Sequence, residues 1–328
     1  FLNFSGRQDY TSTLPTADNS YFYPAFGASA VLTDAIPELK SDVLNYLKIT
    51  GSNSTVYNDL GAEQIIETYG QIFSFPFGTL NSFAPPNGFI DAGIKKEKIE
   101  TTEFGINLGL LKNRVTIDAS YFKTITTDNI VNTTTPNSAG GNGLLTNIGE
   151  LEGDGFEVTL GATILRSDDF SWDVNVNYFT NQTTVNEIGA GLTEITLAST
   201  GEFGVFAVEG EQFPLIKASA YYRDPNGNIV VNPNTGNPIS TTEREGTLKE
   251  LGTTVPDYGI GLNSSVNYKD FRLAATFDYR TGHVYYAQGS DAMEFTGRSK
   301  ESVSANRQDF IIPNSVIETS PGVFVENT

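Results

Sequence analysis

A strict alternation of apolar and polar side chains is the feature that most constrains the fold of this chain. The stretch TTEFGINLGLLKNRVTIDASYF (Thr101 to Phe122) carries an apolar residue at every second position from Phe104 to Leu110 and again from Val115 to Tyr121. Successive side chains of a strand point to opposite faces, so each half predicts a strand with one apolar and one polar face. The polar residues between the halves predict a tight turn, and therefore a hairpin.

The hairpin pattern recurs along the chain. Gly155 to Phe179 and Tyr258 to Tyr279 each hold two alternating segments around a short polar turn. Weaker versions of the pattern lie upstream, in Phe1 to Gln8, Tyr21 to Thr33 and Leu44 to Val56. The sequence thus predicts an all-β chain of about nine antiparallel strands. Short helical periodicity is present only in Ala35 to Leu47 and Ala62 to Tyr69.

Composition excludes several classes of protein. The chain has 328 residues and a formal net charge of −19, so it offers no basic stripe for a nucleic acid. It has no Cys and one His, which excludes a disulfide framework, a thiolate metal site and a Cys-His dyad. No run of about 18 apolar residues is present, so the sequence predicts no membrane-spanning helix.

The apolar faces contact either a protein core or lipid, and two features favour lipid. The opposite faces carry Asp, Asn, Arg, Glu and Thr, and aromatic residues gather near strand ends, as at Tyr121-Phe122 and Tyr178-Phe179. Transmembrane β-barrels combine an apolar outer band, a polar lumen and aromatic girdles. About ten residues at roughly 3.3 Å each, tilted by about 45°, rise about 23 Å, close to the apolar band of about 25 Å. A soluble β-sandwich or β-solenoid is the alternative.

The connections between the predicted strands alternate in length. Leu111 to Asn113, Arg166 to Asp169 and Lys269-Asp270 are tight, whereas long Gly-, Asn- and Thr-rich stretches separate the hairpins. Outer-membrane barrels have short periplasmic turns and long extracellular loops. We therefore expect the tight turns in the periplasm together with Asp34 to Val43, and Asp9 to Ser20 outside.

These assignments predict the surroundings of individual residues. We expect contact with lipid for Val158, Leu160, Val174, Val176, Leu262, Leu273 and Phe277. We expect contact with the lumen for Glu157, Asp173, Asn175, Arg272 and Asp278. We expect the periplasmic rim to hold Lys112, Ser167 and Lys269, and the outside to hold Asn226, Asn137 and Pro76.

Nine strands leave two open edges, and unpaired backbone groups are costly in lipid. The chain is therefore predicted to be part of a larger transmembrane β-barrel, with short periplasmic turns and long extracellular loops. The final residues GVFVENT do not read as a closing strand.

Six segments follow one another in an order and spacing typical of one protein family. They are LNFSGRQDYTSTLP with NSYFYPAFGASAVLTD, LKITGSNSTVYND, EKIETTEFGINLGLLKNRVTIDASYFKTITTDNI, NIGELEGDGFEVTLGATILRSDDFSWDVNVNYFTN, GEQFPLIKASAYYRDPNGNIVVNPNTGNP and VPDYGIGLNSSVNYKDFRLAATFDYRTGH. Across nearly its whole length the chain resembles the SusC/RagA-type TonB-dependent outer-membrane transporters of Bacteroidota.

The resemblance implies a barrel of about 22 strands with a plugged lumen, of which residues 1–328 form part of a single barrel domain. The plug domain, the N-terminal extension and the final strands are expected to lie outside this chain. The resemblance also implies a SusD-like surface lipoprotein as a lid, a TonB-type energy-coupling complex, and import of glycans or oligopeptides. A structural subunit of an outer-membrane assembly and a soluble β-rich surface adhesin are the alternatives.

Candidate chemical motifs are few. The sole His283 lies in RTGHVYY at a strand end, and no nucleophile-elbow motif accompanies it. Asp224, Asn226 and Asn228 match part of a calcium loop, but Ile229 stands where Gly is required, and the Asn-Gly pairs predict tight turns instead. The sequence therefore predicts no enzyme, and no catalytic, cofactor-binding or metal-ligating residue.

One loop offers a candidate contact site. Tyr221, Tyr222, Arg223 and Asp224 combine rings for stacking with charged hydrogen-bonding groups. We expect this loop to contact either a ligand, such as a saccharide or peptide, or neighbouring loops and the lid lipoprotein.

Overall fold

The computed structural model describes all residues except 78, 79, 85, 87, 142 and 190, and it divides into two compact units. The first unit comprises Phe1–Ala198, Phe206–Pro214 and Val255–His283. The second comprises Ser199–Val205, Leu215–Thr254 and Val284–Thr328. No helix in the described part of the chain is long and apolar enough to cross a membrane.

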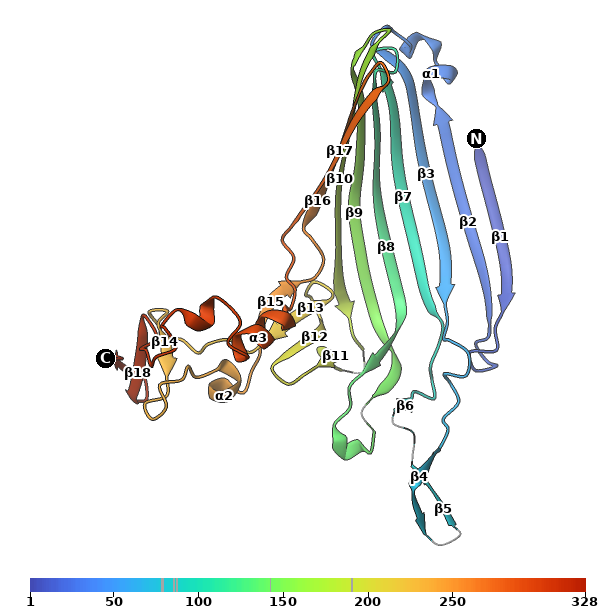
Figure 1. The fold of residues 1–328 in the computed structure, drawn as a ribbon. Coiled ribbons are helices and arrows are strands. Elements are labelled where there is room, and N and C mark those ends of the chain that lie inside the picture. Colours follow the sequence, from blue (N-terminus) through green and yellow to red (C-terminus); the bar gives the residue numbers. More distant parts are fainter. Residues whose placement is uncertain (78–79, 85, 87, 142, 190) are drawn as a thin grey trace. The chain divides into compact units, whose positions relative to one another are not determined.

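The first unit is built on long antiparallel strands that pair with their neighbours along one path (Figure 1). In spatial order they are β1 (Leu2–Tyr10), β2 (Ser20–Val31), β3 (Leu44–Asn58), β7 (Glu97–Leu110), β8 (Val115–Thr133), β9 (Leu144–Arg166), β10 (Phe170–Glu187), β16 (Tyr258–Tyr268) and β17 (Phe271–Thr281). These nine strands, counted over the described residues, confirm the predicted number.

Short elements fill the connections of the first unit. They are α1 (Leu32–Ala35), η1 (Pro37–Leu39), the paired strands β4 (Gly70–Phe77) and β5 (Leu80–Ala84), β6 (Phe89–Ile90), η2 (Asn137–Ala139) and β11 (Glu194–Ser199). Strand β6 runs parallel to the start of β9, and β12 (Phe203–Val208) lies partly in each unit.

Neither of the two segments with helical periodicity forms an α-helix over its length. The segment from residue 35 to residue 47 ends its helical turns at Leu39, and β3 begins at Leu44, because pairing of an alternating strand outweighs a short helical periodicity. The segment from residue 62 to residue 69 forms a turn at residues 62–65 and has no regular secondary structure at residues 66–69. Glu63 there has a φ of 65°, which interrupts a right-handed helix.

The strand register puts apolar residues opposite one another across most of the sheet. One row of directly paired residues consists of Leu47, Leu108, Ile117, Leu160, Val176, Leu262 and Phe277. The next row along the strands consists of Lys48, Asn107, Asp118, Thr159, Asn177, Gly261 and Asp278. Because neighbouring positions on a strand point to opposite faces, the first row lies on one face and the second on the other.

The predicted division of residues between the two faces is confirmed. Paired positions share a face, and all seven residues expected in lipid fall on the face of Leu160, which we call the apolar face. All five residues expected in the lumen fall on the opposite face, which we call the polar face. A bulge between Trp172 and Asp173 keeps this division intact near the turn. Contact with lipid itself stays a prediction.

The apolar face has a clear limit toward the long loops. Phe104, Tyr121 and Phe156 pair in one row, and the rings of Tyr121 and Phe156 lie 4.9 Å apart between centroids. Two residues further along the strands, the same face carries a row of polar and charged residues, Thr102, Lys123, Asp154 and Gln182. On β9 the band from Phe156 to Ile164 spans about 30 Å of strand, or about 21 Å of height at a 45° tilt.

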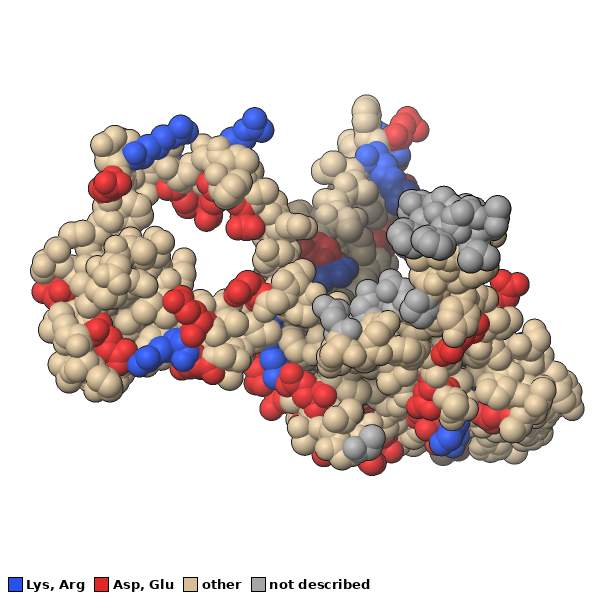
Figure 2. Space-filling model, turned by 90° about the horizontal axis from the view of Figure 1, so that it is seen from below, with Lys and Arg blue, Asp and Glu red and all other residues tan. Residues whose placement is uncertain are grey.

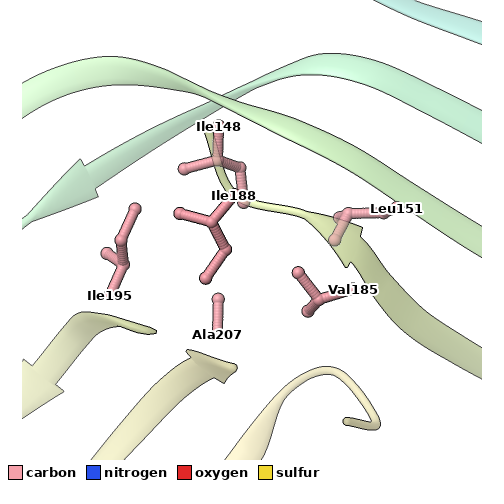
Figure 3. Close-up of a cluster of buried hydrophobic side chains, with 6 residues drawn as sticks. All are labelled: Ile148, Leu151, Val185, Ile188, Ile195 and Ala207. Carbon is pink, nitrogen blue, oxygen red and sulfur yellow. The ribbon is translucent and has the colours of Figure 1, made fainter. Parts of the chain in front are cut away.

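Beyond this limit β9 and β10 continue and enclose a small core, which we call the outer cluster. It consists of Ile148, Leu151, Val185, Ile188, Ile195 and Ala207 (Figure 3). Val185 and Ala207 are fully buried, and Ile148 is 1% exposed. The strand extensions outside the apolar band are therefore held by a conventional hydrophobic core.

The second unit has small sheets of its own. Strand β13 (Leu215–Ala218) pairs with β15 (Lys249–Thr253), β14 (Ile229–Val231) pairs in parallel with β18 (Ser315–Ser320), and β18 pairs with β19 (Val323–Glu326). Its helices are α2 (Thr241–Glu245), α3 (Gln288–Phe295) and η3 (Glu301–Val303). Val230, Val231 and Val316 are buried. Segments that precede β16 and follow β17 thus fold together as one body.

Candidate transport wall and outer loops

The polar face carries hydrogen bonds between the side chains of neighbouring strands. Thr159 donates to Asn177 Oδ1 at 3.0 Å, and Thr276 donates to Asn263 Oδ1 at 2.8 Å. Asn107 also donates to Asp118 across β7 and β8. These side chains keep further hydrogen-bonding capacity, so the face suits water and polar ligands. The apolar face offers no such groups between Phe104 and Leu110.

The tight turns gather at one end of the sheet and the long connections at the other (Figure 1). At the first hairpin Leu111, Lys112 and Asn113 all have positive φ, and the backbone N–H groups of Lys112 and Asn113 donate to Asn45 Oδ1. The predicted grouping of the turns is confirmed. Their assignment to the periplasm stays a prediction.

Acidic groups predominate around the long-loop end. Figure 2 views this end, and it shows more Asp and Glu than Lys and Arg side chains. In the whole chain 39 acidic residues stand against 20 basic ones. This excess of acidic groups favours cationic over anionic solutes.

Lys96, just before β7, forms hydrogen bonds to the loop that precedes β2 and to the start of β2, which are distant in the sequence. Its Nζ donates to Asp18 Oδ1 at 2.7 Å and to the carbonyl of Ser20 at 2.9 Å, and its backbone N–H donates to Asp18 Oδ2. The same ammonium group lies 5.5 Å from the ring centroids of both Tyr21 and Tyr57. Sequence reasoning missed this contact, because 78 residues separate its two charged partners.

Asp59 forms a second tie beside Lys96. Thr13 Oγ1 donates to Asp59 Oδ2 at 2.8 Å, and the hydroxyl of Tyr21 donates to it at 2.9 Å. Burial acts to raise the pKa of Asp59, but hydrogen bonds from Thr11, Thr13 and Tyr21 outweigh it and hold the pKa below its ordinary value. The charged form of Asp59 is therefore favoured by the folded loops.

Acid is expected to loosen the loops that Asp59 holds. Its pKa is lower in the folded than in the unfolded state, so its stabilisation is complete above the unfolded value of about 3.9 and is lost as the pH falls through the folded value. Pepsin cleavage between residues 10 and 20 should therefore rise steeply below about pH 4. Asp59→Asn should raise cleavage already at pH 5 and flatten the pH dependence, whereas exposed Asp34→Asn should change neither. A wild-type cleavage rate that does not vary with pH would contradict this role.

The predicted contact loop lies in the second unit, where its four residues are differently engaged. Asp224 is 6% exposed, and its carboxylate accepts hydrogen bonds from the backbone N–H groups of Asn226 and Asn228 and from the side chain of Asn228, at 2.8–2.9 Å. Burial acts to raise the pKa of Asp224, but these hydrogen bonds outweigh it and lower the pKa. The carboxylate is thus occupied in stabilising a turn closed by Gly227, whose φ is 87°.

The other members of the loop are more open. Tyr221 is 56% exposed and its ring is free to stack. The guanidinium group of Arg244 lies 5.5 Å from the ring centroid of Tyr222, and it forms an ion pair with Glu318 at 2.8 Å. Arg223 donates to the carbonyl of Gly227 at 2.7 Å. Of the four residues, Tyr221 and Arg223 are exposed, whereas Asp224 is buried.

The described residues offer few groups suited to metal binding or to acid-base catalysis. No group of three or more His, Cys, Asp or Glu side chains among the described residues is arranged to hold a metal ion. His283 lies two residues after the end of β17, and its Nδ1 is buried without a hydrogen-bond partner. The acidic side chain of Glu152, near the loop end of β9, is paired with Lys123 at 2.6 Å.

The two-faced antiparallel sheet defines the chain as part of a β-barrel wall. Residues 1–298 match the family model described as "TonB dependent receptor-like, beta-barrel". The chain therefore belongs to the TonB-dependent receptor family and forms part of its β-barrel, and proteins of this family are not enzymes.

Relatives and solved structures agree with this assignment. The chain is 27% identical over 258 residues to TonB-dependent receptor SusC of Bacteroides thetaiotaomicron, covering 73% of this chain and 25% of SusC. It is 23% identical over 311 residues to TonB-dependent receptor P26 of Formosa agariphila, covering 87% of this chain and 30% of that protein. The RagAB peptide transporter structure matches with a TM-score of 0.70 and 18% identity, covering 85% of this chain and 31% of that chain.

The likeness to RagAB concerns the fold. The chain spans less than a third of the length of each of these proteins.

Proposed function

We propose that the chain forms part of the wall of an outer-membrane nutrient importer. The observation that carries the proposal is the pairing of apolar rows on one face and polar rows on the other across seven neighbouring strands. A barrel wall in a membrane needs one face for lipid and one for a water-filled lumen. The family assignment adds that such barrels import their ligands through the outer membrane.

The class of substrate and the partners are part of the proposal. The resemblance to SusC/RagA-type transporters implies import of a glycan or an oligopeptide, and the fold shared with the RagAB peptide transporter is consistent with the second. It also supports a SusD-like surface lipoprotein as a lid and energy coupling through a TonB-type complex. The exposed ring of Tyr221 is the part of the predicted contact loop best suited to the lid or the ligand.

Uptake by the complete protein tests this function. Cells that carry the complete protein and its lipoprotein partner should accumulate labelled oligosaccharides or oligopeptides, and deletion of the protein should abolish this uptake. Unchanged uptake after deletion, with loss of an outer-membrane assembly instead, would favour a structural subunit. Extraction without detergent would favour a soluble adhesin.

Sidedness gives an independent prediction. The chain contains no Cys, so a single introduced cysteine reports on one position. In intact cells a membrane-impermeant maleimide should label cysteines at Asn226, Asn137 and Pro76 but not at Lys112, Ser167 and Lys269. Permeabilised cells, in which all six should react, provide the control. Efficient surface labelling at Lys269 would invert the assigned orientation.

A further inference from the structure

Two rows on the polar face share an unusual composition. In the first row Glu103 on β7 pairs with Phe122 on β8, and Phe122 pairs with Gly155 on β9. A Cβ atom built on Gly155 would lie 2.7 Å from Cζ of Phe122, so the ring lies across the strand of Gly155. The ring thus rests on the sheet, as aromatic rings do over strand glycines.

The second row repeats this arrangement two strands further along the sheet. Glu157 on β9 pairs with Phe179 on β10, and Phe179 pairs with Gly259 on β16. A Cβ atom built on Gly259 would lie 2.3 Å from Cε1 of Phe179. Both rows therefore have the same order across three neighbouring strands: a glutamate, then a phenylalanine, then the glycine on which the phenylalanine ring rests.

The side chains of both glutamates, Glu103 and Glu157, are exposed and have no ion-pair or hydrogen-bond partner in the described part of the chain. The small residues Gly105 and Ser120 share the row of Glu157. A hollow of about 220 Å³ opens over them, and its lining includes Glu103, Glu157 and Asp118. Some other charged groups of the polar face have side-chain partners: Arg280 pairs with Asp278 at 3.0 Å, and Asp118 accepts a hydrogen bond from Asn107.

The chemistry of each row favours a cation. An exposed carboxylate attracts an ammonium or guanidinium group, and the face of an aromatic ring within about 6 Å adds a cation–π attraction. A neutral ligand gains neither contribution. The predominance of acidic groups at the loop end favours the approach of the same kind of solute (Figure 2).

The spacing of the two rows sets the form of the ligand. The second row is displaced from the first by two strands, about 10 Å across the sheet, and by two residues, about 7 Å along the strands. These displacements are perpendicular, so equivalent atoms of the two rows lie about 12 Å apart. In an extended peptide, side chains four residues apart lie on the same side and are separated by about 13 Å.

We propose that the two Glu–Phe–Gly rows form a binding surface for an extended peptide carrying basic side chains four residues apart. The inference rests on the proposed function, because it requires the polar face to line the import pathway. It narrows the substrate to cationic oligopeptides.

The test uses the complete purified protein and two labelled nine-residue peptides of Gly and Ser. One carries Lys at positions 3 and 7, and the other carries Gln there. The Lys peptide should bind about tenfold more tightly at low salt, since each exposed charge pair contributes up to about fivefold in affinity. Glu103→Gln and Glu157→Gln should each weaken its binding about threefold to fivefold, and the double variant should bind both peptides alike.

Glu100→Gln on the opposite face of β7 provides the control and should leave the preference unchanged. Equal binding of the two peptides by the wild type would overturn the proposal. So would substitutions at Glu103 and Glu157 that lower thermal stability without changing binding, because the carboxylates would then contact another segment of the protein. Uptake of oligosaccharides with no binding of the Lys peptide would overturn this inference alone, whereas absence of all uptake would remove the proposed function with it.

Discussion

Leu160→Arg is expected to destabilise the barrel by about 2–4 kcal/mol. Leu160 lies in the middle of the apolar band on β9, paired with Ile117 on one side and Val176 on the other. If this face is in lipid, a guanidinium group there loses its hydration without gaining a partner. Heat-modifiability of the complete protein on gels would report the fraction folded.

Thr159→Arg is the matched control. Thr159 is adjacent in sequence, points to the polar face and receives the same incoming side chain. It should therefore cost much less, since its surroundings are wet. Equal tolerance of both substitutions would mean that the face of Leu160 is not in lipid. Loss of folding at Thr159 alone would invert the assignment of the two faces.

Ile148→Ala is expected to destabilise the outer cluster by about 2–5 kcal/mol. Ile148 is 1% exposed and packs with Val185 and Ile195, so removal of its side chain leaves a cavity that the strands are too constrained to fill (Figure 3). Hydrogen exchange of the segment containing β11 in the complete protein would measure the loss locally.

Ile66→Ala serves as the control for this experiment. Ile66 is also an isoleucine outside the apolar band, but it is 58% exposed, so its truncation should change stability by no more than about 0.5 kcal/mol. If Ile148→Ala leaves exchange near β11 unchanged, the outer extensions of β9 and β10 are held by something other than this core. The remainder of the barrel should be insensitive to both variants.

The sequence predicts the sheet well because one physical signal dominates it. A side-chain period of two is readable wherever one face is apolar, as from Val115 to Tyr121, and the structure confirms the strands and the division of faces there. The signal fades where the strand leaves the apolar band. The stretch from Thr124 to Thr133 mixes Thr, Ile and Asn on both faces, so the extension of β8 was not predictable from periodicity.

Side-chain contacts between distant loops were even less accessible. Asp18 and Lys96 carry no local motif, and only the pairing of β2, β3 and β7 brings them together. In the predicted contact loop, the Asn-Gly pair indicated a turn. Nothing in the sequence showed that the carboxylate of Asp224 accepts the hydrogen bonds that stabilise this turn. Local patterns therefore located the loop, whereas three-dimensional pairing decided which of its groups remain available.

In the proposed barrel wall the face of Leu160 contacts lipid and the face of Thr159 contacts water. Nitroxide labels at each position from Phe156 to Ile164, in the complete protein reconstituted in bilayers, test it most directly. We expect alternation, with labels at even positions relaxed by oxygen and labels at odd positions relaxed by a water-soluble nickel complex. Uniform access of the nickel complex to both sets of positions, or uniform exclusion from both, would contradict it.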